Sequence, residues 1–318
     1  MAVAISQRPR SGGQVLLAYP HGACAGVDRA IDTVERALDR FGAPVYVRGE
    51  IVHNPYVVED LERRGARFVA SEEDVPEGEV CVFSAHGVSP AVRSNARERG
   101  LRVIDATCPL VSKVHVEVRR YARAERTIVL IGRLGHEEVE GALGEAPERT
   151  YVVADEAEID ALPIPADAPV AYAVQTTLAV DDTAHLVARL HERFSDLVGP
   201  SKDDICYASQ NRQAAVKAIA PRCDVVLVVG ATNSSNSNRL VEVARAQGTS
   251  AHLVPNPLGF HAAWLDGADV VGLTAGASAP QRLVDATLER LARLGFDRVS
   301  QHEEVSENVH FPPAKLPA

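Results

Sequence analysis

The chain alternates short apolar strands with helical segments along its whole length, and this alternation restricts the fold more than any other feature. The apolar runs are rich in β-branched residues and have the length of buried strands. Helices between them begin at capping signals such as Asn54-Pro55 and Ser89-Pro90, and several end at glycine. Such a pattern predicts an α/β protein with mainly parallel sheets. The expected strands cover residues 15–19, 45–52, 80–85, 103–106, 127–131, 151–154, 170–174, 225–229, 252–254 and 270–274.

Charge and hydropathy restrict the partners that this chain can have. The net charge of −10 disfavours non-specific binding to nucleic acid. No apolar run approaches the ~18–20 residues of a membrane helix, and the polar opening, 1–14, lacks the apolar core of a signal peptide. We therefore expect a cytoplasmic protein that contacts neither nucleic acid nor membrane.

The five cysteines are too scattered, and odd in number, for a disulfide framework. Cys81 and Cys223 lie in or beside apolar runs and are expected to be packing residues. The other three, Cys24, Cys108 and Cys206, each lie where a strand gives way to a helix. A helix start favours a thiolate, so the shared context predicts that these three thiolates bind one ligand together.

A threefold repeat of positions places polar turns after each of these cysteines. Every third of the chain has a cysteine turn followed by two polar strand ends, and ligands bind at the carboxyl ends of parallel strands. The repeat predicts three small α/β domains that pool their turns around one site. We expect them at 15–106, 107–202 and 203–297, with terminal extensions at 1–14 and 298–318.

Three widely spaced thiolates suit a soft metal but match no compact zinc finger. An iron–sulfur cluster with three protein ligands would leave one iron open to substrate, and this is the favoured interpretation. A zinc enzyme with a vacant coordination position is the alternative.

The second group of candidate residues is polar and suits an anion. His53, His86 and His136 share the strand-end context, and Ser234, Asn236 and Ser278 lie near helix starts. Imidazolium groups, hydroxyls and helix N–H groups together favour phosphate. The chain has neither a lysine-bearing phosphate loop nor Gly-x-Gly-x-x-Gly, so a small phosphorylated metabolite is expected rather than ATP or NAD.

Glu138 is the candidate proton donor. It lies in Gly135-His-Glu-Glu-Val-Glu-Gly141, where burial and repulsion between carboxylates can raise one pKa. Glu137 and Glu140 are expected to be ordinary acids of a helix N-terminus. Glu140 stands where a zinc protease would have its second histidine, which disfavours that class.

Nine motifs, in one order over about 15–311, resemble the 4-hydroxy-3-methylbut-2-enyl diphosphate reductase family. They are Cys24-Ala-Gly-Val-Asp-Arg-Ala30, Val52-His-Asn-Pro, Phe83-Ser-Ala-His-Gly-Val-Ser89, Asp105-Ala-Thr-Cys-Pro-Leu-Val111, Gly135-His-Glu-Glu-Val-Glu-Gly141, Gln175-Thr-Thr-Leu178, Asp204-Ile-Cys-Tyr207, Asn233-Ser-Ser-Asn-Ser-Asn-Arg239 and Thr274-Ala-Gly-Ala-Ser-Ala-Pro280.

The resemblance implies an oxidoreductase that ends the methylerythritol phosphate route to isoprenoids. It would reduce an allylic alcohol diphosphate by two electrons to isopentenyl and dimethylallyl diphosphate, releasing water. The implied fold is a pseudo-threefold cloverleaf of three α/β domains around one [4Fe–4S] cluster per chain. No flavin or nicotinamide motif is present, so electrons would come from an external donor, ferredoxin or flavodoxin.

The resemblance also implies a role for each site residue. Cys24, Cys108 and Cys206 would ligate the cluster, and its open iron would bind the substrate oxygen as a Lewis acid. Glu138 would supply protons, with Thr176 and His136 as further catalytic residues. The substrate-binding residues would be His53, His86, His136, Thr176, Ser234, Ser235, Asn236 and Ser278.

Two alternatives and one departure accompany this interpretation. The same residues could serve a zinc-dependent hydrolase or transferase of a phosphorylated metabolite, or a non-catalytic iron–sulfur sensor.

The family often has an aromatic residue before its first cysteine ligand, where this chain has Ala23. We expect that replacement to shift the cluster's reduction potential and to increase its sensitivity to oxygen.

Overall fold

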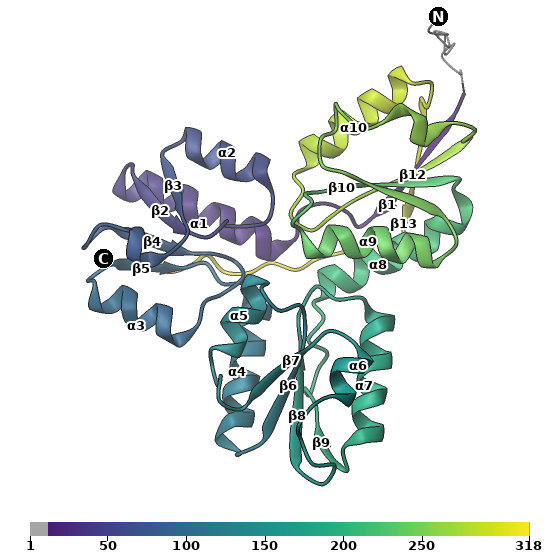
Figure 1. The fold of residues 1–318 in the computed structure, drawn as a ribbon. Helices are drawn as coiled ribbons and strands as arrows, with labels where there is room; N and C mark the ends of the chain where they lie inside the picture. The colour runs from purple at the N-terminus through teal and green to yellow at the C-terminus, as the bar shows by residue number, and fades with distance from the viewer. Residues whose placement is uncertain (1–11, 318) are drawn as a thin grey trace, which may run out of the picture. The chain divides into compact units, whose positions relative to one another are not determined.

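The computed structural model describes residues 12–317, which Figure 1 draws as a ribbon. The chain divides into two compact units. Unit 1 consists of residues 12–23 and Asn211–Asn308, and unit 2 of Cys24–Gln210 with 309–317. Among the described residues, no helix has both the length and the apolar character needed to cross a membrane.

Unit 1 contains one parallel sheet of five strands in the order β11-β10-β12-β1-β13. The strands are β1 (Gln14–Tyr19), β10 (Val225–Val229), β11 (Ser250–Val254), β12 (Val270–Ala275) and β13 (Arg298–Glu303). The helices are α9 (Ser235–Ala246), α10 (Gln281–Arg293) and most of α8 (Tyr207–Ile219), with short 3-10 turns at Ala220–Arg222 and Ala262–Leu265.

Unit 2 contains two parallel sheets of four strands, ordered β3-β2-β4-β5 and β7-β6-β8-β9. The first consists of β2 (Val45–Arg48), β3 (Ala66–Val69), β4 (Val80–Phe83) and β5 (Arg102–Asp105), with helices α1 (Ala25–Phe41), α2 (Pro55–Arg63), α3 (Pro90–Glu98) and a 3-10 turn at Glu72–Asp74. The second consists of β6 (Thr127–Ile131), β7 (Thr150–Val153), β8 (Pro169–Val174) and β9 (Asp196–Val198), with helices α4 (Pro109–Arg123), α5 (Glu137–Leu143), α6 (Glu156–Asp160) and α7 (Val180–Arg193).

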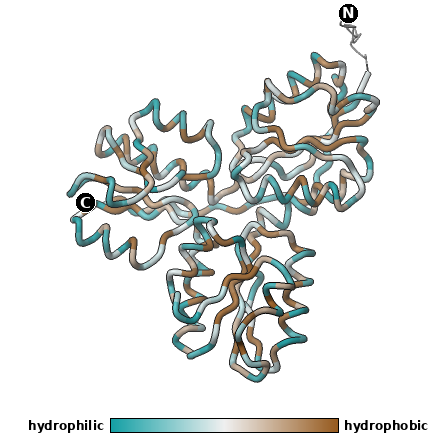
Figure 2. Tube along the Cα trace, in the orientation of Figure 1, coloured by the Kyte–Doolittle hydropathy of each residue, from teal (hydrophilic) through white to brown (hydrophobic). Residues whose placement is uncertain are grey.

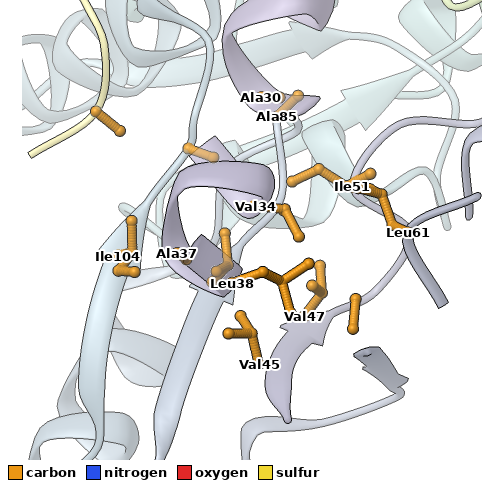
Figure 3. Packing of buried hydrophobic residues seen from close by; sticks show 14 of the residues in the cluster. Ala30, Val34, Ala37, Leu38, Val45, Val47, Ile51, Leu61, Ala85 and Ile104 are labelled. Carbon is orange, nitrogen blue, oxygen red and sulfur yellow. The ribbon is translucent and has the colours of Figure 1, made fainter. Parts of the chain in front are cut away.

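Helix α1 shows how the sequence pattern produces the packing. Its residues Ala30, Val34, Ala37 and Leu38 recur at helical spacing and are all buried against the strands of the first sheet (Figure 3). Full burial of one such valine or leucine stabilises the fold by about 1.5–3 kcal/mol. Figure 2 shows that apolar residues are concentrated in the strands, whereas the helices also carry many polar residues.

Every strand pair in the described residues is parallel, which confirms the prediction of an α/β fold with three mainly parallel sheets. Two details differ from expectation. Strand β1 pairs with β12 and β13 instead of with the sheet of β2. The C-terminal stretch, expected to be a peripheral extension, supplies β13 and a buried residue, Ala314, in the core beneath α1. Of the N-terminal extension, residues 1–11 lie outside the described part.

Candidate functional site

Three cysteines of unit 2 converge at helix starts. Cys24 and Cys108 are the capping residues of α1 and α4, and Cys206 directly precedes α8. A Cβ placed on Gly26 would lie 2.7 Å from the Cys108 sulfur and 3.8 Å from the Cys24 sulfur. Charge on Cys24 or Cys206 would raise the pKa of Cys108, so the third sulfur is also near. The structure therefore brings together the three cysteines that the sequence singled out.

Burial favours the neutral thiol at Cys108 and Cys206 in the protein alone, whereas their helix starts were expected to favour thiolates. Burial raises the pKa of Cys108 to about 12 and that of Cys206 to about 11, and the neighbouring sulfurs add to both shifts. Backbone N–H groups of Leu110 and Val111 oppose the shift at Cys108, but burial outweighs them. Only a cationic occupant would make the three thiols ionise together.

The three predicted histidines lie against one another in unit 2. The rings of His53 and His86 stack with centroids 4.0 Å apart, and His136 meets them edge-on at 5.4 and 5.9 Å. His53 and His86 follow β2 and β4, neighbouring parallel strands whose carboxyl ends lie at the same edge of one sheet. His136 follows β6, a strand of the other sheet of unit 2.

These rings do not all carry positive charge. Burial, with repulsion from His86 and His53, lowers the pKa of His136 to about 3. Burial and repulsion from His86 also lower the pKa of His53. His136 accepts a hydrogen bond from the Glu138 N–H at its Nδ1 (3.2 Å), so its Nε2 carries the proton. With its pKa lowered this far, His136 is neutral at physiological pH and would bind an anion as a neutral N–H donor.

Glu138 is buried beside Thr176, at the start of α5 and the end of β8. Its carboxylate accepts the Thr176 N–H at 2.6 Å and the Thr176 hydroxyl at 2.9 Å. Burial raises the pKa of Glu138 above its usual value, although both bonds from Thr176 oppose the shift. The Cys206 N–H donates to the Thr176 carbonyl at 3.0 Å, which joins this pair to the thiols.

The predicted serines and asparagine lie in unit 1. Ser234 caps α9 and accepts the Ser237 N–H at 3.3 Å. Asn236 accepts the Ala277 N–H at 2.8 Å, which brings the turn containing Ser278 to the start of α9, and Ser235 is the first residue of that helix. The two predicted polar turns of this unit therefore meet each other.

Two residues that support the site, Glu137 and Arg212, were not predicted from the sequence to do so. Glu137, expected to be an ordinary helix acid, lies 2.8 Å from His86 Nδ1, whereas Glu140 fits that expectation and accepts the Gly135 N–H. The fully buried Arg212 donates to the carbonyl oxygens of Gly22 and Ala23, just before the first cysteine. Neither contact has a sequence motif, because each joins segments far apart in the chain.

The class of protein is an α/β enzyme with a thiol-lined site. It is defined by the parallel sheets, the converging thiols and the buried carboxylic acid. A family model described as "LytB protein" matches residues 15–292. The chain belongs to this family, and its relatives are reductases.

The relatives match nearly the whole chain. The 4-hydroxy-3-methylbut-2-enyl diphosphate reductase of Burkholderia pseudomallei is 54% identical over 95% of this chain and 97% of its own length. That of Mycolicibacterium paratuberculosis is 55% identical over 94% of this chain and 90% of its own length. The solved structure of the E-1-hydroxy-2-methyl-but-2-enyl-4-diphosphate reductase from Plasmodium falciparum has a TM-score of 0.92 at 38% identity, covering 96% of each chain. The resemblance inferred from the nine motifs is thereby confirmed.

Proposed function

We propose that this chain reduces (E)-4-hydroxy-3-methylbut-2-enyl diphosphate to isopentenyl and dimethylallyl diphosphate. The observation that carries the proposal is the junction of the three thiols with a buried carboxylic acid. Thr176 forms that junction, because its carbonyl accepts the Cys206 N–H and its hydroxyl and N–H donate to Glu138. Electron delivery and proton delivery thus have candidate groups side by side.

The donor set fits a [4Fe–4S] cluster held by Cys24, Cys108 and Cys206. Three sulfurs converge, and backbone N–H groups near Cys108 and Cys206 favour their ionised form, as in other iron–sulfur sites. When bound, the cluster would supply electrons and a Lewis-acidic iron. Cys81 and Cys223 are proposed to be packing residues, since they lie in or beside the strands β4 and β10.

The chain's own residues would handle the protons and the orientation of the substrate. The reaction breaks the allylic C–O bond: the oxygen leaves as water after taking up one proton, and the allyl fragment takes up two electrons and a second proton. Glu138 is suited to donate because burial raises its pKa and so favours the acid form. The Thr176 hydroxyl would orient the substrate hydroxyl while holding the Glu138 carboxyl in place.

The diphosphate would be bound by neutral donors together with one or more charged histidines. One group of donors consists of the three stacked or edge-on histidines, His53, His86 and His136. The other group consists of hydroxyls and an amide at the start of α9 and before α10, from Ser234, Ser235, Asn236 and Ser278. An external ferredoxin or flavodoxin would supply the electrons, and a cytoplasmic location belongs to the same proposal. So do three domains at 15–106, 107–202 and 203–297, except that β1 and β13 belong to the sheet of the third.

Anaerobic turnover of the allylic diphosphate tests this proposal. The protein should be brown and should contain iron and sulfide. With dithionite and a viologen mediator it should release both isoprenoid diphosphates. Glu138→Gln should keep substrate affinity but lose at least about 100-fold in kcat, whereas Glu140→Gln should retain activity. A colourless zinc protein would favour the hydrolase or transferase alternative, and a brown protein without turnover would favour the sensor.

A further inference from the structure

Two of the three site histidines are each backed by a carboxylate at the same ring nitrogen. His86 Nδ1 lies 2.8 Å from Glu137 Oε2, and His53 Nδ1 lies 3.1 Å from Glu50 Oε2. A carboxylate only accepts hydrogen bonds, so Nδ1 carries a proton in both rings. Their Nε2 atoms can donate to an anion only when the ring is an imidazolium, unlike Nε2 of the neutral His136.

The stacking of the two rings disfavours one metal ion bound by both of them. Nitrogen and oxygen atoms of His53, His86 and Glu137 do lie within 4.8 Å of one another. An imidazole nitrogen, however, binds a metal along a direction in its own ring plane, and the two planes are stacked 20° from parallel with centroids 4.0 Å apart. The arrangement therefore suits two hydrogen-bond donors lying side by side better than a chelating pair.

Stacking also prevents the two rings from being charged equally. Two imidazolium groups at this separation repel each other, which is one cause of the lowered pKa of His53. His86 has the shorter contact to its carboxylate, and no other acid contacts it among the described residues. The groups that face it are Glu137, His53, His136 and the Ser84 hydroxyl.

Glu137 itself is held in place and remains ionised. A Cβ on Gly49 would lie 2.6 Å from Glu137 Oε1, so the turn after β2 packs directly on the carboxylate. Burial alone would raise the pKa of Glu137, but the hydrogen bond from His86 and the charges of His86, His53 and Arg48 hold it below the usual value. Its place at the start of α5 favours the same ionised form.

We propose that Glu137 is a positioning residue that keeps His86 protonated, so that the His86 imidazolium provides the charged anchor for the substrate's diphosphate. This inference rests on the proposed function, because it assigns a task to one histidine of that site. His136 then contributes a neutral N–H. Charge-assisted hydrogen bonds of this kind are about twice as strong as neutral ones.

Titration of inorganic diphosphate into the full-length protein between pH 6 and 8.5 tests the proposal without requiring turnover. Glu137→Gln keeps the shape of the side chain but removes its charge, and should weaken diphosphate binding about tenfold at pH 7.5. The loss of affinity on raising the pH should also begin at lower pH in this variant. Glu140→Gln is the matched control, because it removes a charge from the same helix start without touching a histidine, and it should bind as the wild type does.

A spectroscopic readout separates a charge effect from a packing effect. In the diphosphate complex of the wild type, long-range ¹H–¹⁵N spectra should show both ring nitrogens of His86 protonated at pH 7.5, and Glu137→Gln should show only one. A neutral His86 in the wild-type complex, or equal diphosphate affinity of Glu137→Gln and wild type across the pH range, would overturn the proposal.

The reductase assay distinguishes failure of this inference from failure of the proposed function. Glu137→Gln should raise KM about tenfold with kcat nearly unchanged. Normal turnover with an unchanged KM defeats the role of Glu137 alone. Absence of turnover in every protein, with the diphosphate results as expected, defeats the reductase assignment alone.

Discussion

The buried carboxyl group of Glu138, the proposed proton donor, should weaken the fold at neutral pH. Glu138 is 2% exposed, and its hydrogen-bond partner is Thr176 rather than a cation. Its pKa is raised by burial, so the folded protein favours the protonated form more strongly than the unfolded chain does. Stability from this group is fully present below the unfolded pKa, about 4.3, and is lost as the pH rises toward the folded value.

Glu138→Gln should therefore stabilise the protein while it lowers kcat by at least about 100-fold. The amide cannot ionise, and it can still accept the Thr176 N–H through its oxygen. We expect the melting temperature at pH 8 to rise by about 2 °C relative to the wild type, and the difference to vanish near pH 4. Thermal unfolding at both pH values measures this, and a variant that is less stable than the wild type at pH 8 would contradict it.

The cysteines should separate into three that hold iron and two that do not. Cys108→Ser removes one of the converging sulfurs and should cost most of the bound iron and at least about 100-fold in activity. Cys223→Ser changes a half-buried residue beside β10 and should retain the full iron content. Iron and sulfide analysis of both anaerobically purified variants gives the answer. Loss of iron from Cys223→Ser alone would reverse the assignment.

At the residue scale, the sequence was informative where chemistry needs a rare residue type in a repeated context. Three cysteines at strand-to-helix junctions predicted a common ligand site, and the structure brings their side chains together. The charge state of the thiols was not predictable, because it depends on burial that only the folded chain defines. The partners Glu50 and Glu137 were also missed, since an acid that backs a histidine looks like any other surface acid in a sequence.

At the scale of elements, the turn after β4 is fitted closely against α4 and α5. Gly87 has a φ of +79°, and a Cβ there would lie 2.8 Å from His115 Nε2 and 3.2 Å from Thr107 Cγ2. His115 cannot easily yield, because its ring is 5% exposed and its Nδ1 lies 2.7 Å from the buried Glu145 carboxylate. This packing determines where the preceding residue, His86, lies.

Gly87→Ala should consequently damage both stability and diphosphate binding. A side chain on the left-handed backbone at this position should lower the free energy of unfolding by about 1–2 kcal/mol. The overpacking against His115 should lower it by about 1–3 kcal/mol more. Gly100→Ala is the matched control, with a φ of +66° and no atom within 4 Å of the new Cβ, and should show only the backbone cost. Denaturant unfolding of the two variants should differ by the overpacking cost. Equal losses would show that the turn is loosely packed.

The strands that the hydrophobic pattern does not predict are all at sheet edges. β3, β9 and β13 each end the order of their sheet, and they are short or polar. An edge strand has one neighbour and exposes more of its surface, so it lacks the continuous apolar run that marks a central strand. The central strands β4, β6, β8 and β10 were all predicted, because burial on both faces leaves such a run.

At the scale of the whole molecule, pairing between distant strands was beyond prediction. The strand β1 pairs with β12 and with β13. Its first residue, Gln14, lies opposite Val270 of β12 and Arg298 of β13. Hydrophobic periodicity marks a strand but does not identify its neighbour, so adjacency in sequence placed β1 with β2. The repeat of cysteine turns was still informative, because it depends on strand ends rather than on strand partners.

The C-terminal segment offers a test of how far distant parts of the chain depend on each other. Ala314 is 3% exposed in the core under α1, and Arg29 of that helix donates to the Pro312, Ala106 and Thr107 carbonyl oxygens. Thr107 directly precedes Cys108, a candidate cluster ligand. The Arg29 guanidinium therefore connects the tail to the residue next to that ligand.

Ala314→Asp should therefore undock the tail and loosen the start of α4. A buried carboxylate without a partner is costly, but the loss cannot exceed what docking contributes, since the tail can detach; we expect about 1–3 kcal/mol. Hydrogen exchange should rise at Arg29 and at the first turn of α4, and iron should be lost faster under air. Lys315→Ala, an exposed neighbour, should leave the melting temperature and the iron unchanged. Unaltered exchange at the start of α4 in Ala314→Asp would show that the tail packs on α1 without supporting Cys108.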